Sequence, residues 1–164
     1  MSPSQRIPAL LFASSALMLL GAMAFQYIGE LEPCVLCIWQ RWPYVAVLLL
    51  SLLAFLLAGN RTTRALLLYL CAGTFIVGLG LAVYHLGVEQ GFFEGTATCD
   101  GGETPETFEE LRAQLEAAPV VRCDEVAWSL AGISLAGYNG LISLALAAIS
   151  FIAARDVHRR RMIS

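Results

Sequence analysis

The chain has 164 residues, of which 58% are hydrophobic and only 14% are charged, and its formal net charge is −3. Soluble domains carry about 25% charged residues, so this composition indicates an integral membrane protein. All ten basic residues are arginines, and they form no basic stripe, so nucleic-acid binding is not an expected function.

Four apolar runs are long enough to cross the hydrocarbon core of a bilayer as helices, which takes about 20 residues. The expected spans cover about 7–28, 42–58, 65–86 and 128–154. Uninterrupted apolar runs satisfy their backbone hydrogen bonds as helices rather than as barrel strands. Because most links are short, we predict an all-α integral membrane protein, an antiparallel four-transmembrane-helix bundle forming a single membrane domain over 1–164.

The first run has a competing interpretation. Arg6, the apolar run and the small residues Ala22-Met23-Ala24 loosely resemble a signal peptide with its cleavage site. The apolar run is about 20 residues long, whereas the apolar region of a signal peptide usually has 7–15. We therefore expect a retained span.

The arginines predict the orientation of the bundle. Seven of the ten lie on one side of the predicted membrane: Arg6, Arg61, Arg64, Arg155, Arg159, Arg160 and Arg161. The positive-inside rule assigns that side to the cytoplasm, together with both termini. The loops at about 29–41 and 87–127, the second of them acidic, are then expected outside.

The long loop contains a helix-start pattern. Thr107 is followed by Glu110 as in a capping box, and Phe108, Leu111 and Leu115 recur at helical spacing. The pattern predicts a short amphipathic helix of about three turns on the bundle or in the membrane interface. A lever that moves the loop cysteines is the alternative.

The last apolar run contains small and polar residues, which in lipid usually allow close helix packing. We interpret them as packing residues: Gly132, Gly137, Asn139, Gly140 and Ser143.

Five cysteines are present, and four of them fall on the predicted outer side. Cys71 lies within the third span, where a thiol behaves as a small apolar residue. Cys34, Cys37, Cys99 and Cys123 allow three disulfide pairings, the simplest being Cys34–Cys37 with Cys99–Cys123. A four-thiolate zinc site is not expected, because the second pair is widely spaced and the outer face of a bacterial inner membrane is oxidising. Two purely structural disulfides remain an alternative.

Cys34 and Cys37 have the surroundings of a reactive pair. Pro33 precedes them and a helical run follows, so Cys34 is expected at or near a helix N-terminus, where the backbone N–H groups favour thiolate. Arg41 follows Cys37 by one helical turn. An arginine at a membrane edge either anchors at the headgroups or finds a partner. Here it is a candidate donor to a ligand carbonyl and a cation beside the Cys37 thiolate.

These motifs together resemble the disulfide bond formation protein B (DsbB) family. The resemblance covers the whole chain in span count, loop lengths and cysteine placement. It is carried by Pro33-Cys34-Val35-Leu36-Cys37-Ile38 with Arg41, by Phe25-Gln26, by Thr98-Cys99-Asp100 and by Cys123 before the fourth span. It implies a bacterial inner-membrane enzyme that reoxidises a periplasmic DsbA-like dithiol protein and passes the electrons to ubiquinone or menaquinone in the bilayer.

The resemblance also implies residue roles. Cys99, with Cys123 as its loop partner, would exchange disulfides with the partner's active-site cysteine. Electrons would then pass to the Cys34–Cys37 disulfide, and from Cys37 to the quinone. Arg41 would bind the quinone. His85 matches in position a histidine linked in the family to quinone binding, although an interfacial histidine is the alternative.

Two other functions are compatible with the sequence. A vitamin K epoxide reductase-like enzyme shares a four-helix bundle and CxxC–quinone chemistry, but its CxxC lies near the last helix rather than before the second. A non-enzymatic membrane adaptor would use structural disulfides and the acidic loop to bind a partner.

Overall fold

The computed structural model describes residues 5–57, 59–96, 99, 107–109, 112 and 121–163, with side chains up to 159. The helices are α1 (Arg6–Tyr27), α2 (Val35–Trp39), α3 (Arg41–Leu56), α4 (Arg61–Glu89) and α6 (Leu135–Ile163). Two short strands, β1 (Ser129–Leu130) and β2 (Ile133–Ser134), precede α6. The amphipathic helix predicted for the long loop lies largely outside the described residues.

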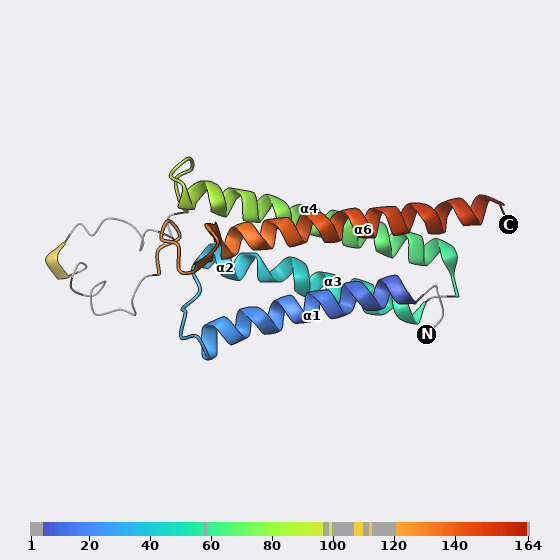
Figure 1. Ribbon diagram of the computed structural model, residues 1–164, viewed down its shortest axis with the longest axis horizontal. Helices are drawn as coiled ribbons and strands as arrows, with labels where there is room; N and C mark the ends of the chain where they lie inside the picture. The colour runs from blue at the N-terminus through green and yellow to red at the C-terminus, as the bar shows by residue number, and fades with distance from the viewer. Residues whose placement is uncertain are drawn as a thin grey trace.

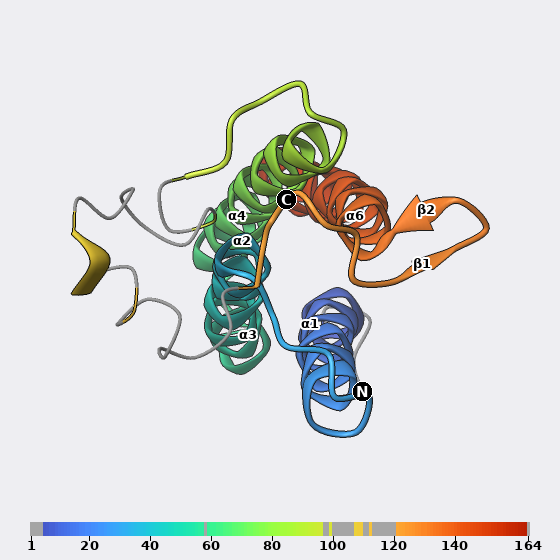
Figure 2. The same cartoon turned by 90° about the vertical axis from the view of Figure 1, so that its left-hand side faces the viewer.

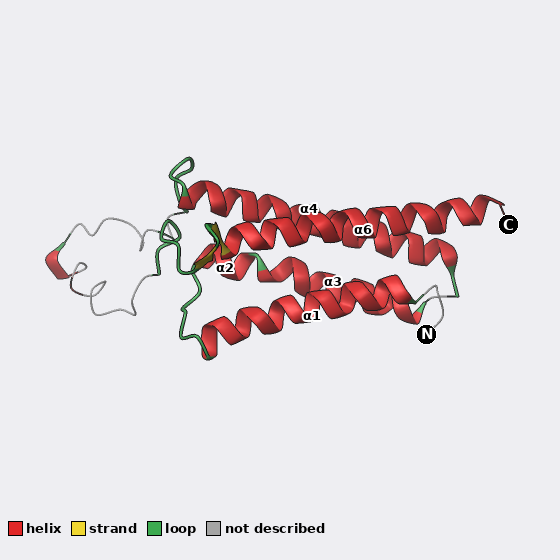
Figure 3. Ribbon diagram, viewed as in Figure 1, coloured by secondary structure: helices red, strands yellow, loops and turns green. Residues whose placement is uncertain are grey.

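Within the described residues, four helical stretches are long and apolar enough to cross a membrane: α1, Val35–Leu56, α4 and Leu135–Arg159. They run side by side, and α1 begins at the same end of the bundle at which α6 ends (Figure 1). Helix dominates the described residues throughout (Figure 3). The predicted fold class, a four-helix multi-pass membrane bundle, is therefore confirmed.

The middle of the bundle presents apolar side chains outward. Leu17 is 72% exposed, Leu49 62% and Val77 60%. An amphipathic helix of a soluble bundle would carry polar residues on that face. An apolar exterior is suited to contact with lipid chains.

The interior is closed by a cluster drawn from all four long helices. Leu11, Val47, Leu68 and Phe75 are almost completely buried in this cluster. Cys71 is fully buried in the same cluster, as its position within an apolar span predicted. Its thiol therefore acts as a small core side chain.

Small residues allow close contacts between α4 and its neighbours. A Cβ added at Gly78 would lie 3.3 Å from Cβ of Pro43 and 3.5 Å from Oγ of Ser143, and one added at Gly140 would lie 3.5 Å from Cβ of Ala82. Such distances leave little room for larger residues. The packing role predicted for Gly140 agrees with this geometry.

Helix α1 packs unevenly along its length. Its buried residues Pro8, Leu11 and Ser15 all lie in its first two-thirds. It packs mainly on α3 and makes few contacts with α6. Figure 2 shows α1 and α3 side by side in the lower half of the bundle, with α4 and α6 in the upper half. The last part of α1 and the first part of α6 instead line a cavity, which is described below.

The helical run of the second span begins earlier than residue 42. Helix α2 starts at Val35 and is followed almost directly by α3, with Gln40 between them. Pro43 has no N–H to donate to the carbonyl of Trp39 four residues earlier, which explains the local break. The helix start at Cys34 agrees with the helical run predicted after Pro33, whereas the span expected to begin at about residue 42 begins too late.

The fourth helix, in contrast, begins later than the residue expected, 128. Residues 129–134 form an antiparallel hairpin in which Ser129 pairs with Ser134 and Leu130 with Ile133. Its two-residue turn has positive φ at both Ala131 (51°) and Gly132 (79°), as a type I′ turn requires. The turn ends the extended segment, and α6 starts at Leu135.

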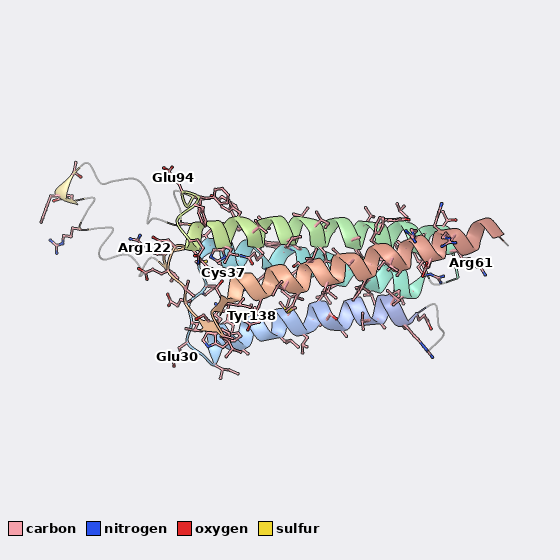
Figure 4. All side chains as sticks on the ribbon, turned by 45° about the horizontal axis from the view of Figure 1, so that its top comes forward. Glu30, Cys37, Arg61, Glu94, Arg122 and Tyr138 are labelled. Carbon is pink, nitrogen blue, oxygen red and sulfur yellow. A yellow bond between two sulfur atoms is a disulfide. The ribbon has the colours of Figure 1, made fainter. Side chains whose placement is uncertain are left out.

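Charged side chains gather at the two ends of the bundle. Arg61 lies at the end where α1 begins, whereas Cys37, Glu30, Glu94 and Arg122 lie at the other (Figure 4). We call the latter, where Cys34 and Cys37 lie, the cysteine end.

Candidate functional site

Cys34 is the N-cap residue of α2. Its backbone is extended (φ −67°, ψ 167°), and its Sγ accepts a hydrogen bond from the backbone N–H of Cys37 at 3.2 Å. The sulfur thus takes the place that a Ser or Asp oxygen usually occupies at a helix start. Unpaired N–H groups and the helix dipole at this position favour negative charge on the sulfur.

The two sulfur atoms of the CxxC pair lie close together. Sγ of Cys34 is 2.7 Å from Sγ of Cys37, and both residues are free thiols. A hydrogen bond from the Cys37 thiol lowers the pKa of Cys34 from 9.0 to about 4; burial opposes this shift, and hydrogen bonds from His85 and from the Cys37 N–H add to it. The surroundings of Cys34 therefore favour its thiolate form.

The loop cysteines form the second pair. Cys99 and Cys123 are joined by a disulfide, with their Cα atoms 5.2 Å apart. It is the loop half of the simplest pairing expected from the sequence, whereas the other half, Cys34–Cys37, is not formed in this structure. Both residues are almost fully buried, in one cluster with Cys34 and Leu36, and Cys37 packs against it. The four cysteines of the cysteine end are thus neighbours in space.

His85 lies near the end of α4, beside the CxxC pair. Its side chain is buried, with the residue 3% exposed. Nε2 lies 3.6 Å from Sγ of Cys34 and 3.9 Å from Oε1 of Glu89, and Nδ1 lies 2.6 Å from Nε2 of Gln40. The histidine is therefore a direct neighbour of the reactive sulfur.

A chain of buried polar groups continues from Gln40 into the bundle. Asn139 Nδ2 donates to Gln40 Oε1. The Tyr44 hydroxyl donates to Asn139 Oδ1 at 2.5 Å and lies 3.1 Å from Oγ of Ser143. These residues come from α3, α6 and the α2–α3 junction, so the chain joins three parts of the bundle to the site.

A cavity of about 420 Å³ opens beside the CxxC pair. Its walls are mainly apolar and come from α1 (Leu17, Met18, Ala22, Phe25) and from α6 (Ala136, Ile142). Phe25 and Trp128 stand together at its edge, with ring centroids 5.3 Å apart. The volume is in the range of pockets that bind small organic ligands.

Polar groups are concentrated at one part of this cavity. Cys37, Arg41, His85 and Glu89 all line it. Arg41, one turn beyond Cys37, has its guanidinium held by a hydrogen bond from Nη1 to Oε1 of Gln26 at 2.7 Å. The cavity therefore offers an apolar body and hydrogen-bond donors next to a thiol, as a ligand with an apolar body and a carbonyl oxygen would require.

Glu89 ties the end of α4 to the start of α6. Its Oε2 accepts a hydrogen bond from the hydroxyl of Ser134 at 2.6 Å. The same hydroxyl oxygen accepts from the N–H of Gly137 at 3.2 Å. Glu89 thus holds the hairpin segment against the site.

Three of the site's side chains have donor atoms that could bind a soft metal. Cys34, Cys37 and His85 each place one such atom within 4.8 Å of the other two. Two thiolates and one imidazole are a known zinc donor set. The same geometry suits a dithiol that is oxidised to a disulfide and reduced again, which requires no metal.

The structure brings together the six residues proposed from the sequence: Cys34, Cys37, Cys99, Cys123, Arg41 and His85. The polar chain of Gln40, Asn139 and Tyr44 was not predicted as part of the site, and Asn139 was interpreted as a packing residue. The available signal was weak. Each is a polar residue inside an apolar run, and such residues in a membrane are costly unless they are partnered.

Comparison with known proteins agrees with this geometry. The family model described as "Disulfide bond formation protein DsbB" matches residues 4–153. Three relatives carry the name "Disulfide bond formation protein B". The one from Marinobacter nauticus is 32% identical over 84% of this chain and 84% of its own. That from Dechloromonas aromatica is 31% identical over 86% and 88%, and that from Psychromonas ingrahamii is 30% identical over 90% and 80%.

No solved structure matches the chain.

Proposed function

This chain belongs to the DsbB family and is a disulfide-forming membrane oxidoreductase, and from this premise we propose that it is a thiol:quinone oxidoreductase. It oxidises a DsbA-like dithiol protein by disulfide exchange and passes the electrons to a quinone in the bilayer. One observation carries the proposal: a loop disulfide, a CxxC pair and an apolar cavity lie next to one another at one end of the bundle.

The two cysteine pairs act in sequence. The dithiol of the partner exchanges with the Cys99–Cys123 disulfide, so the partner gains a disulfide and the loop pair becomes a dithiol. The loop dithiol then reduces the Cys34–Cys37 disulfide and is itself reoxidised. Two electrons and two protons finally leave the Cys34–Cys37 dithiol for the quinone, which gives a disulfide and a quinol. Each exchange proceeds through a mixed disulfide and needs an attacking thiolate, which comes from the partner in the first exchange and from the loop pair in the second. The N-cap position stabilises Cys34 as the thiolate that leaves when the loop dithiol reduces the Cys34–Cys37 disulfide.

The cavity is the proposed quinone site. Its apolar walls suit a lipid-soluble ring, and Cys37 lines it beside the guanidinium of Arg41. Arg41 would donate to a quinone oxygen, which attracts electron density toward that end of the ring. His85 contributes to the wall. Ubiquinone or menaquinone would enter from the lipid between α1 and α6, the two helices that form the apolar walls of the cavity.

The proposed orientation places the cysteine end in the periplasm of a bacterium, with both termini in the cytoplasm. Arg61, Arg64 and Arg155 lie in links or helix ends away from that end, in keeping with the positive-inside rule. The periplasm is oxidising, so the disulfides of this protein and of its partner persist there. A soluble DsbA-like partner would reach Cys99 and Cys123 from that side.

An anaerobic turnover assay tests the proposal. The full-length protein in detergent is mixed with a reduced DsbA-like protein and a soluble quinone, and thiol loss and quinol formation are followed together. We expect one quinol for each partner disulfide. Thiol loss that does not depend on quinone would overturn the proposal, and no thiol loss would favour a membrane adaptor.

The choice between this enzyme and a vitamin K epoxide reductase-like one is tested in the same assay. The CxxC pair of this chain precedes α3 rather than the last helix, which favours the first. Reduction of vitamin K epoxide by the reduced protein would reverse that preference.

A further inference from the structure

The two ring nitrogens of His85 face different kinds of group. Nδ1 meets the side-chain amide of Gln40 at 2.6 Å, and Nε2 faces Sγ of Cys34 at 3.6 Å and Oε1 of Glu89 at 3.9 Å. The residue is only 3% exposed. Its neighbours rather than bulk water therefore decide which nitrogen carries the hydrogen.

The polar chain behind Gln40 has a direction. The Tyr44 hydroxyl donates to Oδ1 of Asn139, and Nδ2 of Asn139 donates to Oε1 of Gln40. With its oxygen already used as an acceptor, Gln40 presents its NH₂ group to His85. An amide NH₂ can only donate, so Nδ1 has to accept and the neutral ring carries its hydrogen on Nε2.

An Nε2–H group at this place is directed at two acceptors. Cys34 Sγ is the nearer, at 3.6 Å, while Glu89 already accepts a hydrogen bond from Ser134 through its other oxygen. A thiolate accepts a hydrogen bond from the ring, and a thiol gains much less from the same contact. The tautomer of His85 therefore bears on the charge of Cys34.

We propose that Gln40 is a positioning residue, which, with Asn139 and Tyr44 behind it, keeps the hydrogen of His85 on Nε2 so that the imidazole donates to the Cys34 sulfur and holds it as thiolate. This inference rests on the proposed function, in which a stabilised Cys34 thiolate is a good leaving group when the loop dithiol reduces the Cys34–Cys37 disulfide. The opposite direction of the same polar chain would put the hydrogen on Nδ1 and turn a lone pair toward the sulfur. The two directions thus predict opposite chemistry at Cys34.

Four titratable groups surround or approach this histidine. Cys34 and Cys37 face it from the α2 end, Glu89 lies one turn along α4, and Arg41 lines the same cavity. The hydrogen bond from His85 is one of the causes that lower the pKa of Cys34.

The tautomer can be read directly by nitrogen NMR. Full-length protein with ¹⁵N-labelled histidine is prepared in detergent, reduced and without quinone, and His158→Gln identifies the signals of the one other histidine. We expect Nδ1 of His85 to be unprotonated and Nε2 protonated. In Gln40→Glu, whose carboxylate can only accept, a hydrogen should appear on Nδ1. A protonated Nδ1 in the unmodified protein would overturn the proposal.

The consequence for Cys34 is measured by its alkylation rate against pH, resolved by peptide mass spectrometry. Gln40→Leu should move the midpoint upward by about one pH unit, a roughly tenfold loss of thiolate below both midpoints. Tyr44→Phe should move the midpoint less, because the Tyr44 hydroxyl is separated from Gln40 by two hydrogen bonds that pass through Asn139. An unchanged midpoint in Gln40→Leu would overturn the proposal.

Ser150→Ala is the matched control. Ser150 is fully buried in α6 and its hydroxyl donates only to the carbonyl of Leu146, so its loss removes a buried polar group outside the chain. An equal shift in this variant would show a merely structural effect and contradict the role of Gln40. If Gln40→Leu does not fold, the NMR of the unmodified protein decides. Neither measurement uses quinone or partner, so each can fail while the turnover assay succeeds, and the reverse.

Discussion

The two cysteine pairs lie at the same end of the bundle but are held in different ways. Cys34 and Cys37 share the first turn of α2, are free thiols 2.7 Å apart, and touch a histidine and a cavity. Cys99 and Cys123 are joined across a 24-residue separation by a disulfide. The first pair is built into the helical scaffold, whereas the second joins two positions outside the long helices.

This difference suggests a division of labour. A pair fixed in a helix keeps a constant relation to Arg41 and to the cavity, which electron transfer to a bound ligand requires. The loop pair lies outside the long helices, but Cys99 is 1% and Cys123 0% exposed, so its segment has to move before a sulfur can reach another protein. The following predictions test whether the pairs are unequal in this way.

The largest expected effect is the loss of Cys37. Cys37→Ser should reduce quinone-dependent thiol oxidation to the uncatalysed background, because no disulfide can form at the cavity. Cys71→Ser is the matched control, since Cys71 is fully buried in the core cluster, and it should retain turnover. Quinol formation over time in the two variants is the measurement. Equal activity in both would remove the distinction between the pairs.

Arg41 should affect the quinone more than the protein partner. Arg41→Gln removes the cationic donor beside Cys37 and should raise KM for quinone roughly 10- to 100-fold, as expected for a hydrogen bond to a charged group. Gln26→Leu removes only the hydrogen bond that holds the guanidinium at 2.7 Å, so its effect should be a fewfold increase. A change in KM for the reduced partner instead would place Arg41 at the loop pair.

Cys34 should stay reactive in acid, unlike an ordinary thiol. Its pKa is lowered from 9.0 to about 4 in the folded protein, so its alkylation should continue at pH 5 and decline as the pH falls through about 4. The same peptide in unfolded protein should lose reactivity below about pH 8, near the value for a free cysteine.

The sign of the pH effect on folding stability follows from the same shift. Because the pKa of folded Cys34 is the lower one, the thiolate stabilises the fold fully above the unfolded pKa, and this contribution is lost as the pH falls through the folded pKa. If the contribution of Cys34 made the reduced protein less stable at pH 8 than at pH 4, the lowered pKa of Cys34 would be contradicted.

The smallest expected effect concerns an exposed ion pair beside the loop disulfide. Arg122 binds Asp124 at 2.6 Å, with the two side chains 54% and 41% exposed, and this hydrogen bond lowers the pKa of Asp124. Exposed pairs contribute little to stability. Asp124→Asn should therefore leave both the melting temperature and the turnover unchanged, and a clear loss of turnover would instead place this pair in partner contact.

Much of the fold follows from the sequence, because lipid requires long apolar helices and Arg placement separates the two ends. The position of Cys34 at a helix start and of Arg41 one turn after Cys37 also follows from local spacing. These features depend on neighbours within one helix.

The contacts between helices could not be predicted in the same way. His85, Gln40 and Asn139 come from separate segments, and their meeting depends on how each helix is rotated about its axis. With apolar residues on nearly all faces, the sequence does not define that rotation. The hairpin at 129–134 was absorbed into the expected fourth span for a related reason, since its apolar residues resemble those of a helix and only the positive φ of Ala131 and Gly132 reveals the turn.

One measurement tests the division of labour most directly. The variant Cys99→Ser/Cys123→Ser is reduced, freed of reductant without oxygen, and mixed with excess soluble quinone. We predict one quinol per protein in a single turnover, formed by Cys34 and Cys37 alone, and no oxidation of added DsbA-like dithiol protein. Failure of this variant to form quinol, with its fold intact, would contradict the claim that the CxxC pair is the site of quinone reduction.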